Sequence, residues 1–221
     1  MADRAFWQAQ ADALDQARAG GEIDDAQWFT EMAAIFESAY LEGENPRAQS
    51  GFGGDEARWE AGRRPIVDAI DRDGTFLDIG CASGHLLESL VRWTPHRIEP
   101  YGVDLAPGLV ELARRRLPQW ADRIFLGNAL SWEPPLRFDF VHTELVYVPA
   151  DRQRAFVERL LTGVVAPGGR LILCGYGSPR SEVVPHPVCA TVSSWGFEPE
   201  LELCAAAPEG GPIIELTALR A

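Results

Sequence analysis

The sequence predicts an α/β fold with a doubly wound, mostly parallel seven-stranded sheet, a C-terminal antiparallel hairpin and an N-terminal helical cap. From residue 75 onward, short apolar runs alternate with helical stretches, which is typical of a parallel sheet covered by helices on both faces. The run 76–85 (FLDIGCASGH) joins a buried strand to a helix through a turn of small residues. Near the end of the chain, Ala-Pro-Glu-Gly-Gly-Pro connects two apolar runs in the manner of a hairpin.

The first part of the chain predicts a helical cap over residues 1–54. A helical period runs through residues 3–19 and is stopped by Gly20-Gly21. Asp24, with Gln27 three residues later, has the spacing of a capping box and predicts the start of a second helix. An apolar stripe from Trp28 through Met32 to Tyr40 follows, and that face must be buried against the rest of the chain.

The segment 42–54 is rich in Gly, Pro and Asn and predicts a mobile loop between the cap and the remaining unit, residues 55–221. Two readings of this loop stay open: a lid that closes over a bound cofactor, or a plain linker. A helix pair interrupted at Pro65 is expected over residues 55–71.

The elements expected in residues 55–221 follow from the pattern of apolar residues and from the Pro and Gly residues that begin or end each element. Pro107 stands at a first helical position, and Pro167-Gly168-Gly169 ends a helix before the strand RLILCGY. A short helix is expected to end near Trp195. The expected strands are 75–79, 101–104, 123–126, 138–142, 170–176, 199–204 and 213–219, with helices at 85–93, 107–117 and 151–165.

Composition excludes several functions. The 221 residues carry 20 basic and 33 acidic side chains, and a net charge of −13 disfavours binding to nucleic acid. All the basic residues are arginine, so lysine-dependent Schiff-base and Walker-type phosphate chemistry is excluded. The four cysteines lack metal-ligand spacing, so we expect no metal site. Without a signal-like start or an apolar run of about 18–20 residues, we expect a cytoplasmic protein that does not enter a membrane.

The turn after residue 79 predicts an adenosine-type ligand. Asp104 ends the next strand, 20 residues after Gly84, where a carboxylate can accept hydrogen bonds from two ribose hydroxyls. The dinucleotide fingerprint would need glycine at 80, 82 and 85, and this chain has Ala82 and His85. Asp78 would also repel a diphosphate. A cationic ligand with an amino group, such as S-adenosylmethionine, fits this acidic site better.

From about residue 58 to the end, the sequence resembles the class I, Rossmann-like S-adenosylmethionine-dependent methyltransferases of the bacterial small-molecule type. Their first motif, (D/E)xGxGxG, matches Asp78, Gly80 and Gly84, with Ala82 replacing the middle glycine. Asp104 matches the acidic residue after the second strand, and residues 127–129 (GNA) match the adenine-binding segment. FDFVHTELVYVP and APGGRLILCGY resemble the motifs of the fourth and fifth strands.

The resemblance implies transfer of a methyl group from S-adenosylmethionine to an O, N or C nucleophile of a small molecule. It also implies that cofactor contacts come from the residues around the first three strands and from the loops above them. These are Asp78, Gly80, Cys81, Ala82, Gly84, Asp104, Leu105, Asn128, Ala129, Glu144, Phe52 and Arg58.

Several residues are candidates for catalysis or for binding the methyl acceptor. His142 is a candidate general base, or a strand-end histidine satisfied by backbone; Glu144 is a candidate for binding an amine, or a solvated loop carboxylate. Tyr147, Tyr40 and Phe52 are candidates for an apolar acceptor pocket, as are Trp28 and Phe36 unless they serve helix packing. A catalytically silent binding protein and a methyltransferase acting on protein or RNA remain alternatives. The acceptor and the oligomeric state are left open.

Overall fold

The computed structural model describes residues 4–178 and 182–221, and within them the sheet has the order β3-β2-β1-β4-β5-β7-β6. Strands β1 to β5 are parallel, and β7 pairs antiparallel with both β5 and β6. This confirms the predicted sheet and its closing hairpin. The strands are β1 Gly74–Ile79, β2 Ile98–Asp104, β3 Ile124–Leu126, β4 Phe138–Thr143, β5 Val165–Tyr176, β6 Leu201–Ala206 and β7 Pro212–Arg220.

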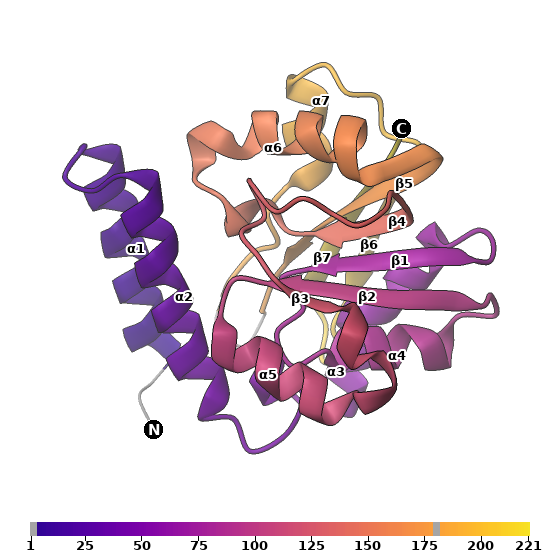
Figure 1. The fold of residues 1–221 in the computed structure, drawn as a ribbon, viewed down its shortest axis with the longest axis horizontal. Coiled ribbons are helices and arrows are strands. Elements are labelled where there is room, and N and C mark those ends of the chain that lie inside the picture. Colours follow the sequence, from indigo (N-terminus) through magenta and orange to yellow (C-terminus); the bar gives the residue numbers. More distant parts are fainter. Residues whose placement is uncertain (1–3, 179–181) are drawn as a thin grey trace.

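Helices cover both faces of the sheet (Figure 1). One face carries α3, α4 and α5, and the other carries α6 and α7. The helices are α1 Arg4–Ala19, α2 Asp25–Leu41, α3 Glu56–Arg63, α4 His85–Trp93, α5 Pro107–Arg116, α6 Gln153–Arg159 and α7 Val188–Ser194. Short 3-10 turns are η1 Ala48–Ser50, η2 Arg64–Ala69, η3 Pro118–Arg123, η4 Leu145–Tyr147 and η5 Ala150–Arg152, and η6 Leu160–Val164 is a π-helical turn.

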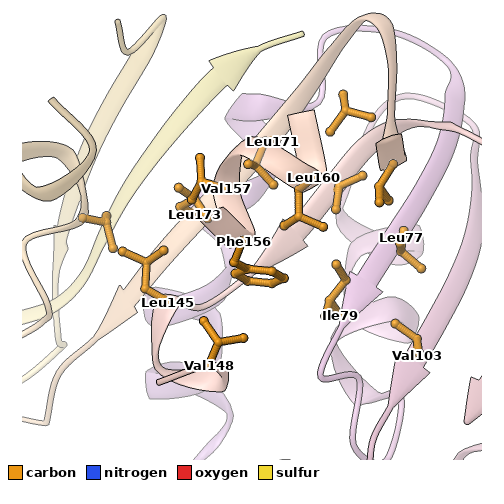
Figure 2. Close-up of a cluster of buried hydrophobic side chains, with 14 of the residues drawn as sticks. Leu77, Ile79, Val103, Leu145, Val148, Phe156, Val157, Leu160, Leu171 and Leu173 are labelled. Atoms are coloured by element: carbon orange, nitrogen blue, oxygen red, sulfur yellow. The ribbon is translucent and has the colours of Figure 1, made fainter. Parts of the chain in front are cut away.

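The hydrophobic core has a separate cluster on each face, because alternate strand residues point to opposite sides. Figure 2 shows the cluster under α6, where Phe156 and Leu160 meet Leu77 and Leu171 of the sheet. The opposite cluster includes Trp59 of α3 and Leu87 of α4. With both faces buried, the strand ends are where polar side chains can gather around a ligand.

The helix starts follow the predicted signals, with one difference. Asp24 caps α2 by accepting a hydrogen bond from the Gln27 backbone N–H at 2.8 Å, and Pro107 is the first residue of α5. The capping box is only half formed, because the Gln27 side chain donates to Glu31 instead of returning to the cap.

The α1–α2 pair stands at the carboxyl ends of the parallel strands (Figure 1). Trp28 and Met32 of α2 are buried in the same cluster as Leu145, which follows β4. At the other end of α2, the Glu37 carboxylate accepts from the Gly108 backbone N–H in the first turn of α5. Trp28 therefore packs in the core, as the helix-packing interpretation predicted, and does not line an acceptor pocket.

Two expected boundaries were wrong. The expected helix 151–165 is a short α6 followed by the π-helical turn η6, which contains Gly163, a residue that disfavours a regular helix. The Pro167-Gly168-Gly169 segment does not precede β5 but forms a bulge within it, between the pairs Val165–Phe138 and Arg170–Phe140. Gly169 is required there, because a Cβ atom would lie 2.7 Å from the Asp139 carbonyl oxygen.

Candidate functional site

The turn between β1 and α4 has a backbone that only small residues tolerate. Gly80 and Gly84 have φ angles of 82° and 74°, in the left-handed region where glycine is favoured. Ala82 also has a positive φ of 45°, so the alanine adopts a backbone conformation that a glycine would adopt more easily. The replacement of the middle glycine therefore leaves a left-handed turn at this position.

Asp104 lies at the end of β2 against this turn. Its carboxylate accepts hydrogen bonds from the backbone N–H groups of Ala82 at 2.8 Å and Ala106 at 2.9 Å. Burial raises the pKa of Asp104 to about 6, although these two hydrogen bonds favour the ionised form. Each carboxylate oxygen keeps a lone pair that can accept a hydrogen bond from a ligand.

The loop 42–54 is tied to the same turn. The fully buried Ser83 hydroxyl lies 2.8 Å from the Ser50 hydroxyl and 2.9 Å from the Pro46 carbonyl oxygen, to which it donates. Arg116 of α5 donates to the Ser83 carbonyl group from the other side. The loop therefore lies directly over the turn, as a lid would, and its mobility stays a prediction.

A polar cluster lies at the ends of β1, β4 and β5. Asp78 and His142 are both about 97% buried, and Asp78 Oδ1 lies 2.8 Å from His142 Nδ1. His142 Nε2 lies 3.2 Å from the Tyr176 hydroxyl. Burial opposes the charge of His142, but Cys174 and the Asp78 carboxylate more than offset it, so the pKa of His142 is raised. His142 is thus satisfied by side chains rather than by backbone, and neither ring nitrogen is free to accept a proton from a substrate.

Glu144 and Tyr147 form the outer part of this cluster. The Tyr147 hydroxyl donates to Glu144 Oε1 at 2.7 Å. Burial raises the pKa of both groups. The Tyr147 ring lies over Gly80, because a Cβ atom on Gly80 would be 2.4 Å from the ring. The structure therefore brings these two predicted residues directly beside the turn.

Arg63, the last residue of α3, is the residue that the sequence analysis missed. Its side chain is buried, and its guanidinium carbon lies 3.3 Å from the centroid of the Tyr176 ring and 5.0 Å from that of Trp59. Within the described residues its guanidinium donates a long hydrogen bond of 3.3 Å to the Gly62 carbonyl oxygen, and no carboxylate there lies at ion-pair distance from it. Trp59 and Arg63 are four residues apart, so they share one helix face, and this spacing could have signalled that Arg63 is buried.

The remaining predicted residues lie around the turn with different partners. Phe52 packs edge-on against Trp59, with ring centroids 5.4 Å apart. Asn128 Oδ1 accepts from the Leu130 backbone N–H at 2.9 Å in the turn after β3. Cys81 is buried beneath the turn, and Leu105 and Ala129 pack against the core beside it. The Arg58 guanidinium pairs with Glu209 in the β6–β7 turn, and no hydrogen bond in the described part of the chain joins it to residues 80–84.

Two negative findings concern the described residues alone. No group of three His, Cys, Asp or Glu side chains there is arranged to hold a metal ion. No helix among them is long and apolar enough to cross a membrane.

Comparison with known proteins places this site in a family. Residues 76–169 match the family model described as "Methyltransferase domain". The chain is 30% identical over 138 residues to the ubiquinone/menaquinone biosynthesis C-methyltransferase UbiE of Geobacter sulfurreducens, covering 59% of this chain and 52% of the relative. It is 32% identical over 95 residues to a trans-aconitate 2-methyltransferase of Methylobacterium radiotolerans, covering 43% and 35% of the two chains. The matches thus span about half or less of these curated relatives.

Solved structures share the fold at low sequence identity. The N-methyltransferase NodS of Bradyrhizobium japonicum, in complex with S-adenosyl-l-homocysteine, has a TM-score of 0.63 at 17% identity, covering 84% of this chain and 95% of that one. The 1,6-didemethyltoxoflavin-N1-methyltransferase of Burkholderia thailandensis has a TM-score of 0.62 at 18% identity and covers 90% of each chain. Residues 76–169 thus match a methyltransferase-domain family, and the chain shares its fold with these solved methyltransferases.

Proposed function

We propose that the protein is an S-adenosylmethionine-dependent methyltransferase acting on a small molecule. The observation that carries the proposal is the left-handed turn at Gly80–Gly84 with the Asp104 carboxylate hydrogen-bonded across it. This arrangement lies inside the segment that matches the methyltransferase family. The curated relatives are named for small acceptors, and the net charge of −13 argues against a nucleic-acid acceptor.

The side chains at the strand ends suit each part of this cofactor. Asp104 would accept hydrogen bonds from the ribose hydroxyls, and the second lone pair of Asn128 Oδ1 would accept from the adenine amino group. Asp78 would offer a carboxylate oxygen to the α-amino group, although it shares its charge with His142. Arg63, a buried guanidinium without a carboxylate partner among the described residues, would pair with the cofactor's α-carboxylate. The four groups together match a ligand that carries both charges.

Tyr147 has to move for this fit. Its ring now covers Gly80, the point where the backbone would be approached most closely. Tyr147 ends the short turn η4, and Leu145 at the start of that turn is buried in the core, so the movement has to come from the Tyr147 side chain and not from the turn. The Tyr147 side chain would then form a wall between cofactor and acceptor.

S-adenosylmethionine supplies a methyl group already activated by the positive charge on its sulfur. The protein therefore has to position the acceptor, exclude water and remove a proton. We assign the role of base to Glu144, because burial raises its pKa and its carboxylate accepts from Tyr147, whose ring covers Gly80. His142 instead holds Asp78 in position.

Calorimetric titration with S-adenosylhomocysteine and with NAD tests the cofactor assignment. We expect saturable binding of the first and none of the second, and the reverse result would refute the proposal. A catalytically silent binding protein would bind the cofactor equally well. Transfer of radioactive methyl groups to a library of small acceptors, with protein and RNA fractions as parallel samples, separates that alternative and macromolecular acceptors from the proposed activity.

A further inference from the structure

A groove runs between α1, α2 and the loop 42–54, with a cavity volume of about 310 Å³. Its lining includes Trp7 of α1, Phe36 and Tyr40 of α2, and Phe52 of the loop 42–54. Phe36 is 39% exposed, and its ring lies 5.7 Å from that of Tyr40. Four aromatic side chains from three segments therefore face one hollow.

Two of the residues that line the groove, Tyr40 and Phe52, also border the candidate active site. Tyr40 packs against Ala82 in the turn after β1 and against Ala106 beside it. Phe52 contacts Trp59, and its ring centroid lies 5.5 Å from the Arg63 guanidinium. Tyr40 and Phe52 thus stand between the groove and the glycine turn with its polar cluster. Methyl transfer to a molecule in the groove therefore requires these two side chains, which lie on or beside the loop 42–54, to turn aside.

The charges around the groove favour one class of ligand. Glu42 is the one charged side chain among the described residues that line it, and no basic side chain does so there. The faces of aromatic rings carry negative potential, which attracts cations and repels anions. The net charge of −13 acts in the same direction at longer range.

We propose that this groove binds the methyl acceptor, and that the acceptor is an aromatic small molecule without negative charge. The inference rests on the proposed methyltransferase function. The acceptor class differs from the carboxylate anion in the name of the trans-aconitate relatives. In this proposal, acceptor recognition is the role of Trp7, Phe36, Tyr40 and Phe52, and the turn after β1 has no part in it.

Three indole probes of matched size test the proposal by calorimetry on the full chain saturated with S-adenosylhomocysteine: tryptamine (cationic), indole-3-ethanol (neutral) and indole-3-acetate (anionic). We expect the first two to bind at least tenfold more tightly than the third. Phe36→Ser should weaken tryptamine binding at least fivefold, whereas Val91→Ser, at a valine of equal exposure on α4, should leave it unchanged. Glu42→Gln should weaken tryptamine but leave indole-3-ethanol unaffected.

The outcomes separate this inference from the proposed function. Failure of all three probes to bind, equal binding of all three, or no effect of Phe36→Ser would overturn the groove assignment while S-adenosylhomocysteine still binds. Failure of S-adenosylhomocysteine itself to bind would overturn the proposed function instead.

Discussion

The glycine turn and the polar cluster meet at the carboxyl end of β1, yet they are built differently. The turn is made by backbone groups: the left-handed residues Gly80, Ala82 and Gly84, and N–H groups that bind Asp104. The cluster is made by side chains from separate elements, with Asp78 on β1, His142 on β4 and Tyr176 on β5. Arg63 of α3 stacks on Tyr176. We infer that the turn is sensitive to the shape of a single residue, whereas the cluster is sensitive to the charge and hydrogen bonding of several.

The sharpest test of the turn is Gly80→Val. The branched side chain would meet the Tyr147 ring and would have to adopt a φ of 82°, a conformation that costs about 1–3 kcal/mol for a residue with a Cβ. We expect S-adenosylhomocysteine binding to become undetectable in a titration, while circular dichroism shows a folded protein. Gly163→Val, in a position where an added Cβ meets nothing, is the matched control. Normal binding by Gly80→Val would show that the turn is not the site.

On the cluster side, Glu144→Gln should lower kcat by roughly 10²- to 10³-fold, because it removes a general base without changing shape. The affinity for S-adenosylhomocysteine should change less than threefold. Glu133→Gln, at a carboxylate whose side chain is 90% exposed, should leave both quantities unchanged. Unaltered kcat in the Glu144 variant would remove it from the mechanism.

Arg63→Met distinguishes a ligand-binding guanidinium from a structural one. A lost charge-assisted pair with the cofactor carboxylate should weaken S-adenosylhomocysteine binding by roughly ten- to a hundredfold, or about 1.5–3 kcal/mol. The free energy of unfolding should fall by up to about 2 kcal/mol, because Met cannot replace the contact of the buried guanidinium with the Tyr176 ring. Arg58→Met provides the comparison, because Arg58 pairs with Glu209. An equal loss of affinity in both variants would contradict the assignment of the carboxylate to Arg63.

The smallest expected effect is the pH dependence of the free energy of unfolding that arises from Asp104. Its pKa of about 6 in the folded protein exceeds the ordinary value of 3.8, so this residue's contribution to stability is full below about pH 3.8 and is lost as the pH rises through 6. Between pH 4 and 7, the free energy of unfolding of the cofactor-free protein should fall by about 2 kcal/mol relative to Asp104→Asn.

Cofactor affinity should change in the opposite direction, because the ionised Asp104 is the better acceptor for ribose hydroxyls. Binding of S-adenosylhomocysteine should therefore weaken as the pH falls below 6. Parallel pH profiles for the native protein and Asp104→Asn, in both unfolding and titration experiments, would mean that Asp104 does not titrate in this range.

Local sequence patterns were enough to predict the sheet, its closing hairpin and most of the turn after β1. The alternation of apolar runs and helical stretches predicted strands that match β1 to β7 apart from their ends, and the start of β5 was wrong because a Gly-Gly bulge looks locally like a break. The turn could be read because Asp78, Gly80 and Gly84 lie within seven residues, where local backbone conformation depends on local residues.

The side chains that surround this turn are brought there by packing between distant segments of the chain. Nothing local distinguishes Arg63 from a surface arginine, but α3 packs against β6 and β7 and puts its guanidinium on Tyr176 of β5. His142 looked like a free base until the parallel register of β1 and β4 placed it opposite Asp78. Phe36 and Phe52 were candidates for one pocket, and the placement of α1 and α2 at the strand ends brought them together with Trp7. Such contacts join residues far apart in the chain, so their chemistry depends on packing that no local pattern encodes.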